Sequence, residues 1–265
     1  MERSIIVPWD FTEVANFALE HAYFIGKVTN RPIYLIHITN KESKIEELTR
    51  QMQEVANKFM EGKEIKVEAV VRKGNLTKEL INFGQEVNAY IAVMGTHGIS
   101  TIGKAMKIVK KFVKMPFILV QSPVFFGEYD RICVPIDDNK KSRIKMQWVR
   151  YLSNLFESKV FIISPTVFDG WKVKNLNNNL RFAEKQLEQN LIEFEFKKIE
   201  ANQNFPEAIY DYMREVEADL VLMMTTKYKE YIKNLKKPEN KELYKKIPIM
   251  CVNPRTDIQK LGGFN

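Results

Sequence analysis

A glycine-rich segment carries the clearest chemical signal in this sequence. It reads Met94-Gly95-Thr96-His97-Gly98-Ile99-Ser100-Thr101-Ile102-Gly103-Lys104 and begins at the end of a short apolar run. Glycine lets a backbone approach a ligand closely, and a helix that starts behind such a turn attracts an anion, beside which Lys104 adds a positive charge. The pattern therefore favours phosphate binding, although a tight strand-to-helix turn explains the same glycines equally well.

Asp10 and the histidines are the other candidates for chemistry. Asp10 ends the first apolar run, where its carboxylate can accept a hydrogen bond from a ribose hydroxyl or cap the following helix, and both interpretations stay open. His97 can contact a ligand from the glycine turn, or it can occupy a turn position that tolerates unusual backbone angles. His21 lies on the apolar stripe of a helix, which predicts a packed side chain. No histidine stands at metal-ligand spacing from a Cys or Glu, so we expect no catalytic residue, no metal site and no dedicated turnover.

The string from Gly98 to Lys104 also satisfies the first seven positions of a P-loop. Ala105 stands where a P-loop needs a Ser or Thr oxygen for Mg²⁺, and the string follows the fourth apolar run of its half. We therefore do not interpret it as a P-loop.

Composition describes an ordinary globular chain with a modest positive charge. The 265 residues are 45% hydrophobic and 28% charged, and the formal charge of +8 favours anionic partners without identifying one. Cys133 and Cys251 each lie inside a short apolar run, which indicates buried strand residues rather than a metal or disulfide pattern. There is no cationic leader and no apolar run of about 18 residues. We expect a cytoplasmic, soluble protein without a membrane span.

The chain repeats itself once. Ile6-Val7-Pro8-Trp9-Asp10 is echoed 127 residues later by Cys133-Val134-Pro135-Ile136-Asp137, and three later apolar runs find partners in the same order at offsets of 127, 129 and 132. This predicts two similar halves in tandem, residues 1–124 and 128–265, with Gly127 in the linker between them.

Within each half, apolar runs alternate with segments of helical periodicity. This predicts an α/β fold of two tandem doubly wound domains, each a five-stranded parallel sheet with helices on both faces. Strands are expected near 4–8, 32–38, 65–71, 90–94 and 117–121, and again near 131–135, 159–163, 192–199, 219–224 and 248–252. Helices are expected over 76–87 and 103–114, and Thr12 stands where its hydroxyl would cap the first helix. Ligands of such sheets bind beyond the carboxyl ends of the strands.

The second half lacks the glycine turn. No glycine occurs between Gly170 and Gly262, and Met224, Thr226 and Tyr228 place side chains at the corresponding positions. Basic residues gather there instead: Lys227, Lys229, Lys233, Lys236, Lys237, Lys241, Lys245 and Lys246, with Tyr228, Tyr231 and Tyr244 among them. A surface for nucleic acid or another anionic partner is one interpretation. We prefer a solvated helix and loop, without a nucleic-acid partner, because no recognition-helix or RNA-module signature accompanies the lysines.

Two motifs resemble the universal stress protein family. Val7-Pro8-Trp9-Asp10-Phe11-Thr12 is similar to its Val-Pro-x-Asp-Phe-Ser opening, and Met94-Gly95-Thr96-His97-Gly98 is similar to its Met-Gly-Thr-His-Gly. The resemblance covers the whole chain as two such domains, strongly in the first half. In the second half it rests on the strand pattern and on Val134-Pro135-Ile136-Asp137.

The nucleotide-binding branch of that family implies Gly-x-x-Gly, nine residues, and then Gly-Ser or Gly-Thr around the phosphates of ATP. Gly95 and Gly98 match, but Gly103-Lys104 follows after only four residues, so the loop is shortened by five and Lys104 replaces the hydroxyl. The resemblance implies that ATP or AMP would bind in the first half only, with adenine and ribose near Pro8, Asp10 and Ile38. The candidate binding residues are Pro8, Asp10, Ile38, Met94, Gly95, His97, Gly98, Gly103 and Lys104.

Two functions from different classes follow. The first is a stress-response module whose N-terminal half binds an adenine nucleotide and whose C-terminal half is structural and empty. The alternative is a nucleotide-free interaction module that recruits a protein or nucleic acid. In either case the halves are expected to pack as an internal pseudo-dimer through residues 117–121 and 248–252, because an unpaired apolar edge strand invites association. A further homodimer is compatible with the sequence but not implied by it.

Overall fold

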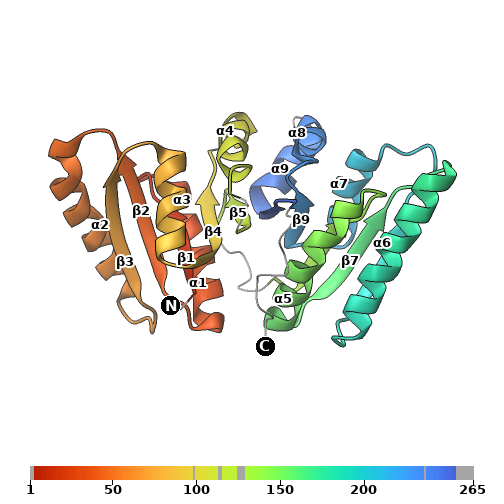
Figure 1. Ribbon diagram of the computed structural model, residues 1–265, viewed down its shortest axis with the longest axis horizontal. Helices are drawn as coiled ribbons and strands as arrows, with labels where there is room; N and C mark the ends of the chain where they lie inside the picture. Colours follow the sequence, from red (N-terminus) through yellow and green to blue (C-terminus); the bar gives the residue numbers. More distant parts are fainter. Residues whose placement is uncertain (1–2, 98, 113–114, 124–128, 236, 255–265) are drawn as a thin grey trace. The chain divides into compact units, whose positions relative to one another are not determined.

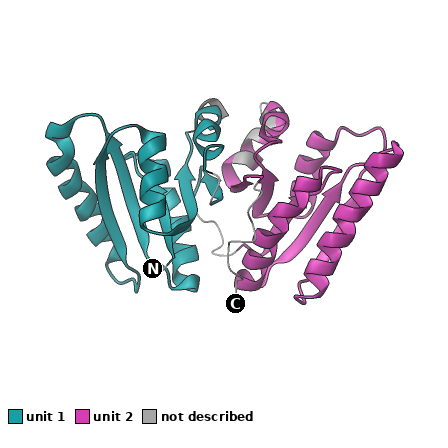
Figure 2. Ribbon diagram, viewed as in Figure 1, with its two compact units in different colours: residues 1–127 teal, residues 128–265 magenta. Residues whose placement is uncertain are grey.

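The computed structural model describes residues 3–97, 99–112, 115–123, 129–235 and 237–254. The chain divides into two compact units, residues 1–127 and 128–265 (Figure 2). Each unit alternates strands and helices around a parallel sheet. The predicted α/β fold with two tandem domains is confirmed.

The first unit carries five strands that all run parallel. Its elements are β1 (Ser4–Pro8), α1 (Glu13–Thr29), β2 (Ile33–Thr39), the short 3-10 helix η1 (Glu42–Lys44), α2 (Ile45–Met60), β3 (Val67–Lys73), α3 (Leu76–Glu86), β4 (Ala89–Gly95), α4 (Ile99–Val109) and β5 (Phe117–Val120) (Figure 1). The strand order is β3-β2-β1-β4-β5. The chain moves from β1 outward to β3 and then returns to the other side of β1, so the order reverses between β1 and β4.

Helices cover both faces of this sheet. Ile5, Ile6 and Val7 are consecutive in β1, so their side chains point alternately to opposite faces, yet all three are fully buried. Right-handed crossovers place α1 and α2 on one face and α3 and α4 on the other. Because both faces of the sheet are covered, its open positions lie at the strand ends.

The start of α1 differs from the expectation. Thr12 is the residue before the helix, as predicted, but its side chain caps no backbone N–H group. Its hydroxyl donates instead to the carboxylate of Asp10. The cap prediction for Thr12 is therefore wrong, because its hydroxyl lies beside Asp10 and its oxygen accepts from no N–H group of the helix.

The second unit repeats the strand order of the first. Its elements are β6 (Arg131–Pro135), the 3-10 helix η2 (Lys140–Lys145), α5 (Met146–Phe156), β7 (Lys159–Ser164), α6 (Gly170–Glu188), β8 (Phe194–Lys198), α7 (Phe205–Glu215), β9 (Leu220–Met224), α8 (Tyr228–Leu235), α9 (Pro238–Lys246) and β10 (Ile249–Val252). The order is β8-β7-β6-β9-β10, again parallel throughout. Its switch point therefore lies between β6 and β9.

The observed elements depart from the sequence-based boundaries mainly in one helix. Most strands lie within two residues of their predicted positions, but α4 begins at Ile99 rather than at residue 103. The helix expected over 103–114 ends at Val109, and residues 113 and 114 lie outside the described part of the chain. The early start of α4 decides how the glycine segment must be interpreted.

Candidate functional site

Asp10, Thr12 and His97 meet at the switch point of the first unit. Asp10 follows β1 and His97 follows β4, and their side chains form an ion pair with 3.0 Å between Asp10 Oδ2 and His97 Nε2. The backbone N–H of Thr12 donates to Asp10 Oδ1 over 3.2 Å. Both ion-pair side chains are about half exposed, at 56% for Asp10 and 44% for His97. The sequence singled out Asp10 and His97 separately, and the fold brings them together.

Hydrogen bonds decide the charge of Asp10. Partial burial opposes ionisation, but hydrogen bonds from the Thr12 side chain, from His97 and from the Thr12 backbone outweigh it and lower the pKa of the Asp10 carboxyl. Asp10 is therefore an anionic acceptor at neutral pH. The helix-capping alternative is only partly right, since the N–H that Asp10 accepts belongs to the residue before α1.

The three side chains do not form a nucleophilic relay. In a catalytic triad the carboxylate and the hydroxyl bond to different ring nitrogens of the histidine. Here Asp10 Oδ2 and Thr12 Oγ1, at 3.0 Å and 3.3 Å, both lie beside His97 Nε2. The Thr12 hydroxyl also donates its proton to Asp10. The arrangement holds a carboxylate in place and does not activate the hydroxyl.

An aromatic group borders the same strand ends. His37 in β2 lies with Nδ1 2.7 Å from the carbonyl oxygen of Trp9, so Nδ1 carries the proton. Phe11, with a positive φ of 63°, places its ring edge-on to His37 at 5.1 Å and is 40% exposed. Trp9 is buried, and its Nε1 has no hydrogen-bond partner among the described residues. Sequence reasoning passed over these rings, whose only signal was their place beside the strand ends.

The remaining predicted residues fall into three groups. Pro8 ends β1, Ile38 lies near the end of β2, and Met94 and Gly95 end β4, all at the same edge of the sheet. Gly98 lies outside the described residues. Gly103 and Lys104, expected at the very start of a helix over 103–114, lie one turn inside α4 because this helix begins at Ile99. From the fifth helical residue onward an N–H bonds within the helix, so neither backbone N–H can hold a phosphate.

The two described glycines of the segment have different physical roles. A Cβ at Gly95 would lie 2.4 Å from the carbonyl oxygen of Val14 in α1, a distance that no side chain tolerates. A Cβ at Gly103 would meet nothing within 4 Å. Gly95 is therefore required by the close approach of α1 to β4. No comparable steric need exists at Gly103.

His21 is packed, as its stripe position predicts. It is 3% exposed, and Nε2 lies 3.2 Å from the carbonyl oxygen of Ser122. Burial lowers the pKa of its imidazole to about 4, and the bond to Ser122 opposes that shift. No group of three or more metal-ligating side chains occurs within the described residues.

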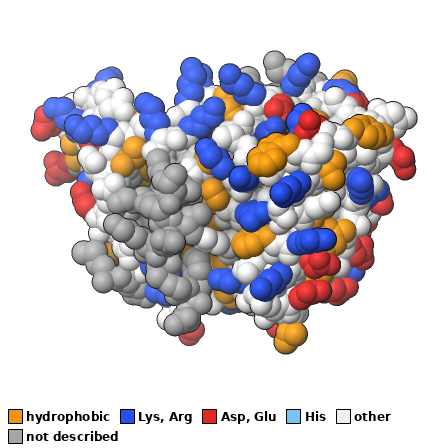
Figure 3. All heavy atoms as spheres, turned by 45° about the vertical axis from the view of Figure 1, so that its right-hand side comes forward, with side chains coloured by type: hydrophobic (Ala, Val, Ile, Leu, Met, Phe, Trp, Pro, Cys, Tyr) orange, Lys and Arg blue, Asp and Glu red, His pale blue; other side chains and the backbone are white. Residues whose placement is uncertain are grey.

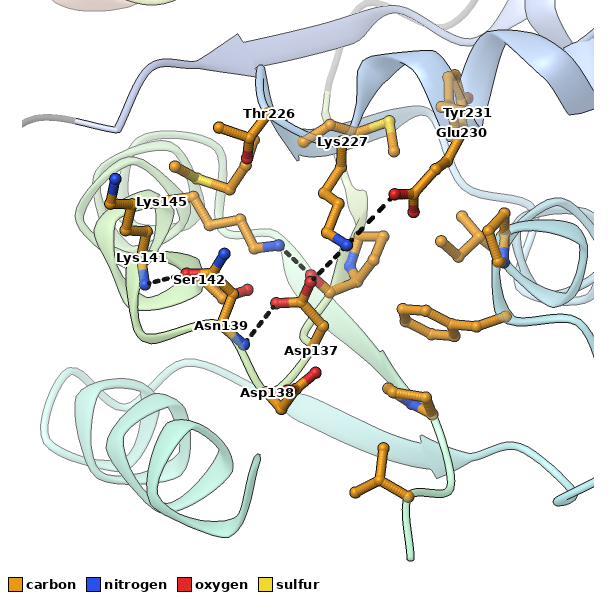
Figure 4. Close-up of a pocket in the computed structure, with 18 of the residues that line it drawn as sticks. Asp137, Asp138, Asn139, Lys141, Ser142, Lys145, Thr226, Lys227, Glu230 and Tyr231 are labelled. Atoms are coloured by element: carbon orange, nitrogen blue, oxygen red, sulfur yellow. Dashed lines mark hydrogen bonds and ion pairs between the residues drawn. The ribbon is translucent and has the colours of Figure 1, made fainter. Parts of the chain in front are cut away.

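A cavity lies at the switch point of the second unit. The sequence predicts that side chains at this place keep backbone N–H groups from surrounding a phosphate. The volume of the cavity is about 250 Å³, and Met224 and Thr226 line it rather than fill it (Figure 4). It opens at the carboxyl ends of β6, β7 and β9. The second half therefore has open space at its switch point, lined by side chains rather than by a glycine turn.

Charged side chains from three elements converge on this cavity. Lys227 Nζ lies 3.6 Å from Asp137 Oδ2 and 3.4 Å from Glu230 Oε1 (Figure 4). Lys145, at the end of η2, is 2% exposed, and its ammonium donates to the carbonyl oxygen of Pro135. Burial lowers the pKa of Lys145 to about 8, while Asp137 opposes the shift. Sequence analysis did not select Lys145, because nothing in the sequence separates it from the many exposed lysines.

The lysine-rich segment of the second half is a solvated surface with many ion pairs. Lys237 pairs with Glu207 of α7, and Lys245 pairs with Glu242 at 2.6 Å. Lys229, Lys233, Lys245 and Lys246 are exposed. Figure 3 shows that the face in this view carries many basic side chains, together with acidic and hydrophobic ones. The side chains of Lys236, Lys241 and Tyr244 lie outside the description.

Comparison with known proteins identifies similar sequences and similar folds. Residues 1–108 match the model of the universal stress protein family. A universal stress protein from Archaeoglobus fulgidus DSM 4304 aligns with a TM-score of 0.72 and 16% identity, over 96% of this chain and 97% of that one. A functionally unknown protein from Pseudomonas aeruginosa PAO1 aligns at 0.65 and 11% identity, over 96% and 93% of the two chains.

A third solved structure extends the likeness to another kind of protein. The cytoplasmic domain of a prokaryotic cation chloride cotransporter aligns at 0.56 and 10% identity, over 95% of each chain. None of the curated proteins compared matches the chain. In the part of the chain that the structure describes, no helix is both long and apolar enough to cross a bilayer. Residues 1–108 are therefore a universal stress protein domain, and the second unit repeats the strand order of the first.

Proposed function

We propose that this protein is a stress-response module that binds an adenine nucleotide in its first unit without dedicated turnover. The observation that carries the proposal is the anionic Asp10, held by Thr12 and His97 at the switch point beside Gly95. A fixed carboxylate at this edge can accept hydrogen bonds from a ribose hydroxyl or an adenine amino group. Pro8 and Ile38 supply apolar surface for the base at the neighbouring strand ends.

The start of α4 is the phosphate-binding element in this proposal. A helix terminus offers about four free N–H groups and a partial positive charge. Lys104 lies in the second turn of α4 with an exposed side chain, so its charge can assist without direct backbone contact. One helix terminus suits one phosphate group, so we expect AMP to bind at least as tightly as ATP.

The geometry at His97 supports the proposed lack of dedicated turnover. Its Nε2 lies beside both Asp10 and Thr12, so this nitrogen is not free to take a proton from the Thr12 hydroxyl or from an attacking water. Prolonged incubation of the protein with ATP should therefore release no more phosphate than the Asp10→Asn variant does.

Calorimetric titration with AMP, ADP and ATP, supported by thermal shifts, tests the proposal. A ligand that binds only the folded state must raise the unfolding temperature. Asp10→Asn should abolish most of the heat. Lys104→Ala should weaken binding and reduce its salt dependence, because exposed charge pairs are screened. Lys107→Ala, which removes another exposed charge of α4, is the matched control and should bind as the parent does.

Two results would contradict the proposal. Unchanged titration curves for Asp10→Asn and Lys104→Ala would show that the first unit does not hold the ligand. No response to any of the three nucleotides would favour the nucleotide-free interaction module instead. Phe168 and Trp171, 80% and 62% exposed at the start of α6, are the surface residues that favour this alternative.

A further inference from the structure

We infer that the cavity of the second unit binds a small organic anion, with a phosphate or carboxylate head beside Lys145 and Lys227 and an apolar body against Phe205, Ile209 and Met224. This site lies wholly within residues 128–265 and does not rest on the nucleotide proposal for the first unit. The two proposals can therefore fail separately.

The size of the cavity sets the size of the ligand. Its volume of about 250 Å³ is far more than the roughly 10–15 Å³ that one water needs. It lies just below the roughly 300 Å³ at which sites for drug-sized molecules begin. A single ring or short chain with one anionic group fits these limits.

The charge balance selects an anion. Lys145 and Lys227 share Asp137 as their common carboxylate, and Glu230 reaches only Lys227. Lys141 and Lys172 also line the cavity without an ion pair to another described residue, and Asp138 is its third carboxylate, so four lysines face three carboxylates. A buried ammonium is costly unless its charge is compensated. Lys145 is buried, donates to the neutral carbonyl of Pro135 and shares the carboxylate of Asp137 with Lys227. An anion beside Lys145 and Lys227 would add negative charge next to both ammonium groups.

One wall of the cavity is apolar and rigid. Phe205 and Ile209 contribute from α7, and Met224 contributes from the end of β9. Tyr231 also lines the cavity and stacks on Tyr210 with ring centroids 4.6 Å apart, and the Tyr210 hydroxyl donates to the Tyr231 carbonyl over 3.0 Å. This wall favours a ligand with a hydrophobic body over inorganic phosphate alone.

The lack of a glycine turn in the second unit disfavours a nucleotide in this cavity. Asp137 occupies the position that Asp10 holds in the first unit and is held in the same way, by the Asn139 N–H over 3.2 Å and by Lys227, so this carboxylate does not distinguish the two sites. Without glycine between residues 170 and 262, no backbone segment can surround a polyphosphate closely. Lysine side chains must hold the anionic head instead.

NMR titration of the full chain labelled at its methionine methyl groups tests the inference. The probes are phenyl phosphate, benzoate, phenol, inorganic phosphate and AMP. Phenyl phosphate, benzoate or both should shift the Met224 methyl signal, and the preference between them identifies the anionic head. Phenol and inorganic phosphate should each bind at least about tenfold more weakly, because phenol lacks the anionic head and inorganic phosphate lacks the apolar body.

A shift of the Met224 signal by phenol as strong as by the anions would overturn the inference, as would no shift by either anion. Tighter binding of AMP at Met224 would overturn the class of ligand.

Charge-removing variants locate the head group. Lys227→Met should weaken the preferred anion about tenfold or more, since a charge-assisted contact is lost. Lys229→Met is the matched control, because Lys229 is exposed on α8 and does not line the cavity. Equal affinities for the two variants would contradict the assignment. Lys145→Met removes the buried ammonium and should also weaken the preferred anion. A cooperative unfolding transition of this variant first shows that it is folded.

Proton uptake gives a second readout at Lys145. An anion beside this ammonium should raise its pKa, so binding near pH 8 to 9 should take up a proton, seen as a buffer-dependent heat. The charged or titratable groups around Lys145 are Cys133, Asp137, Asp138, Lys141, Lys172, Lys227 and Glu230. The uptake should disappear in Lys145→Met and persist in Lys229→Met. Binding with no proton uptake in the parent protein would place the anion away from Lys145 and overturn this part of the inference.

Discussion

At the scale of single residues, the two halves place different cations beside equivalent carboxylates. Asp10 and Asp137 each follow the first strand of their unit. Asp10 pairs with His97, whereas Asp137 pairs with Lys227, and both partners follow the fourth strand. Partial burial opposes the charge of Lys227, but Asp137 and Glu230 outweigh it and raise the pKa of this lysine. The second unit therefore keeps a cation at its switch point.

Gly95 and Gly103 should respond to alanine with opposite signs. Gly95→Ala should lower the free energy of unfolding by about 1–3 kcal/mol, because the new methyl group meets the Val14 carbonyl oxygen. Gly103→Ala should raise it by about 0.5–1 kcal/mol, because Gly103 lies inside α4 with free space around it. Urea unfolding of both variants measures the difference. A destabilised Gly103→Ala would show that the α4 geometry is wrong.

His21 should make stability depend on pH in acid. Its pKa is about 4 in the folded protein and about 6.5 in an unfolded chain, so the unfolded state takes up the proton first. The contribution is therefore complete above pH 6.5 and is lost as the pH falls toward 4. The expected loss at pH 5 is about 2 kcal/mol.

Urea midpoints at pH 7 and pH 5 for the parent and for His21→Gln measure this contribution. Other titrating groups are common to both proteins, so their effects cancel in the comparison. The variant should lose about 2 kcal/mol less than the parent over this interval. Equal losses in the two proteins would show that His21 is not buried in its neutral form.

At the scale of elements, the start of α4 separates a turn from a phosphate loop. The string Gly98 to Lys104 matches a P-loop in composition, but residues 99–104 are helical. A P-loop needs several consecutive backbone N–H groups that point inward, and a helix directs all but the first few along its own axis. The helix therefore removes the P-loop interpretation for a geometric reason.

Helix capping gives a prediction for α3. The Asn75 side chain accepts from the N–H groups of Thr77 and Lys78, over 3.1 Å and 3.2 Å. Asn75→Ala should lower the free energy of unfolding by about 1 kcal/mol, whereas Asn75→Asp should preserve it. The control is Lys44→Ala at the start of α2, where no side-chain cap exists. Chemical denaturation should find Lys44→Ala within about 0.5 kcal/mol of the parent. Equal effects of the two alanine variants would rule out the cap.

At the scale of the whole molecule, each five-stranded sheet has two edges. The edges are β3 and β5 in the first unit and β8 and β10 in the second. The apolar sequences of β5 and β10 predict that these strands are paired in an internal pseudo-dimer, because open apolar edges promote association. The sequence of β8, Phe194-Glu195-Phe196-Lys197-Lys198, contains three charged residues, and none of its five residues is buried. This composition predicts that β8 is an open edge.

Hydrogen exchange of the full chain tests this pairing. The amides of β5 and β10 that point away from β4 and β9 should exchange as slowly as those of the central strand β1. The outward amides of β3 and β8 should exchange much faster. Fast exchange of the outward amides of β5 or β10 would refute the pseudo-dimer prediction.

The sequence by itself determined the fold class, the repeat and the strand positions. Buried parallel strands must be continuous apolar runs, so Ile5-Ile6-Val7 and Leu220-Val221-Leu222 identify themselves without tertiary information. The motifs at Asp10 and Gly95 identified the edge of the sheet where the first candidate site lies. These signals are local, because each depends on neighbours within a few residues.

Only the tertiary structure decided what those residues contact. The need for glycine at residue 95 comes from Val14, which lies about 80 residues earlier, and the ion pair of Asp10 joins two strand ends that are equally distant in sequence. The cavity of the second unit exists because Met224 and Thr226 lie along its wall and do not fill it. The packing of the surrounding elements decides these side-chain positions. Lys145 becomes distinctive for the same reason: its burial is a property of the elements around it, and its sequence neighbours are ordinary surface lysines.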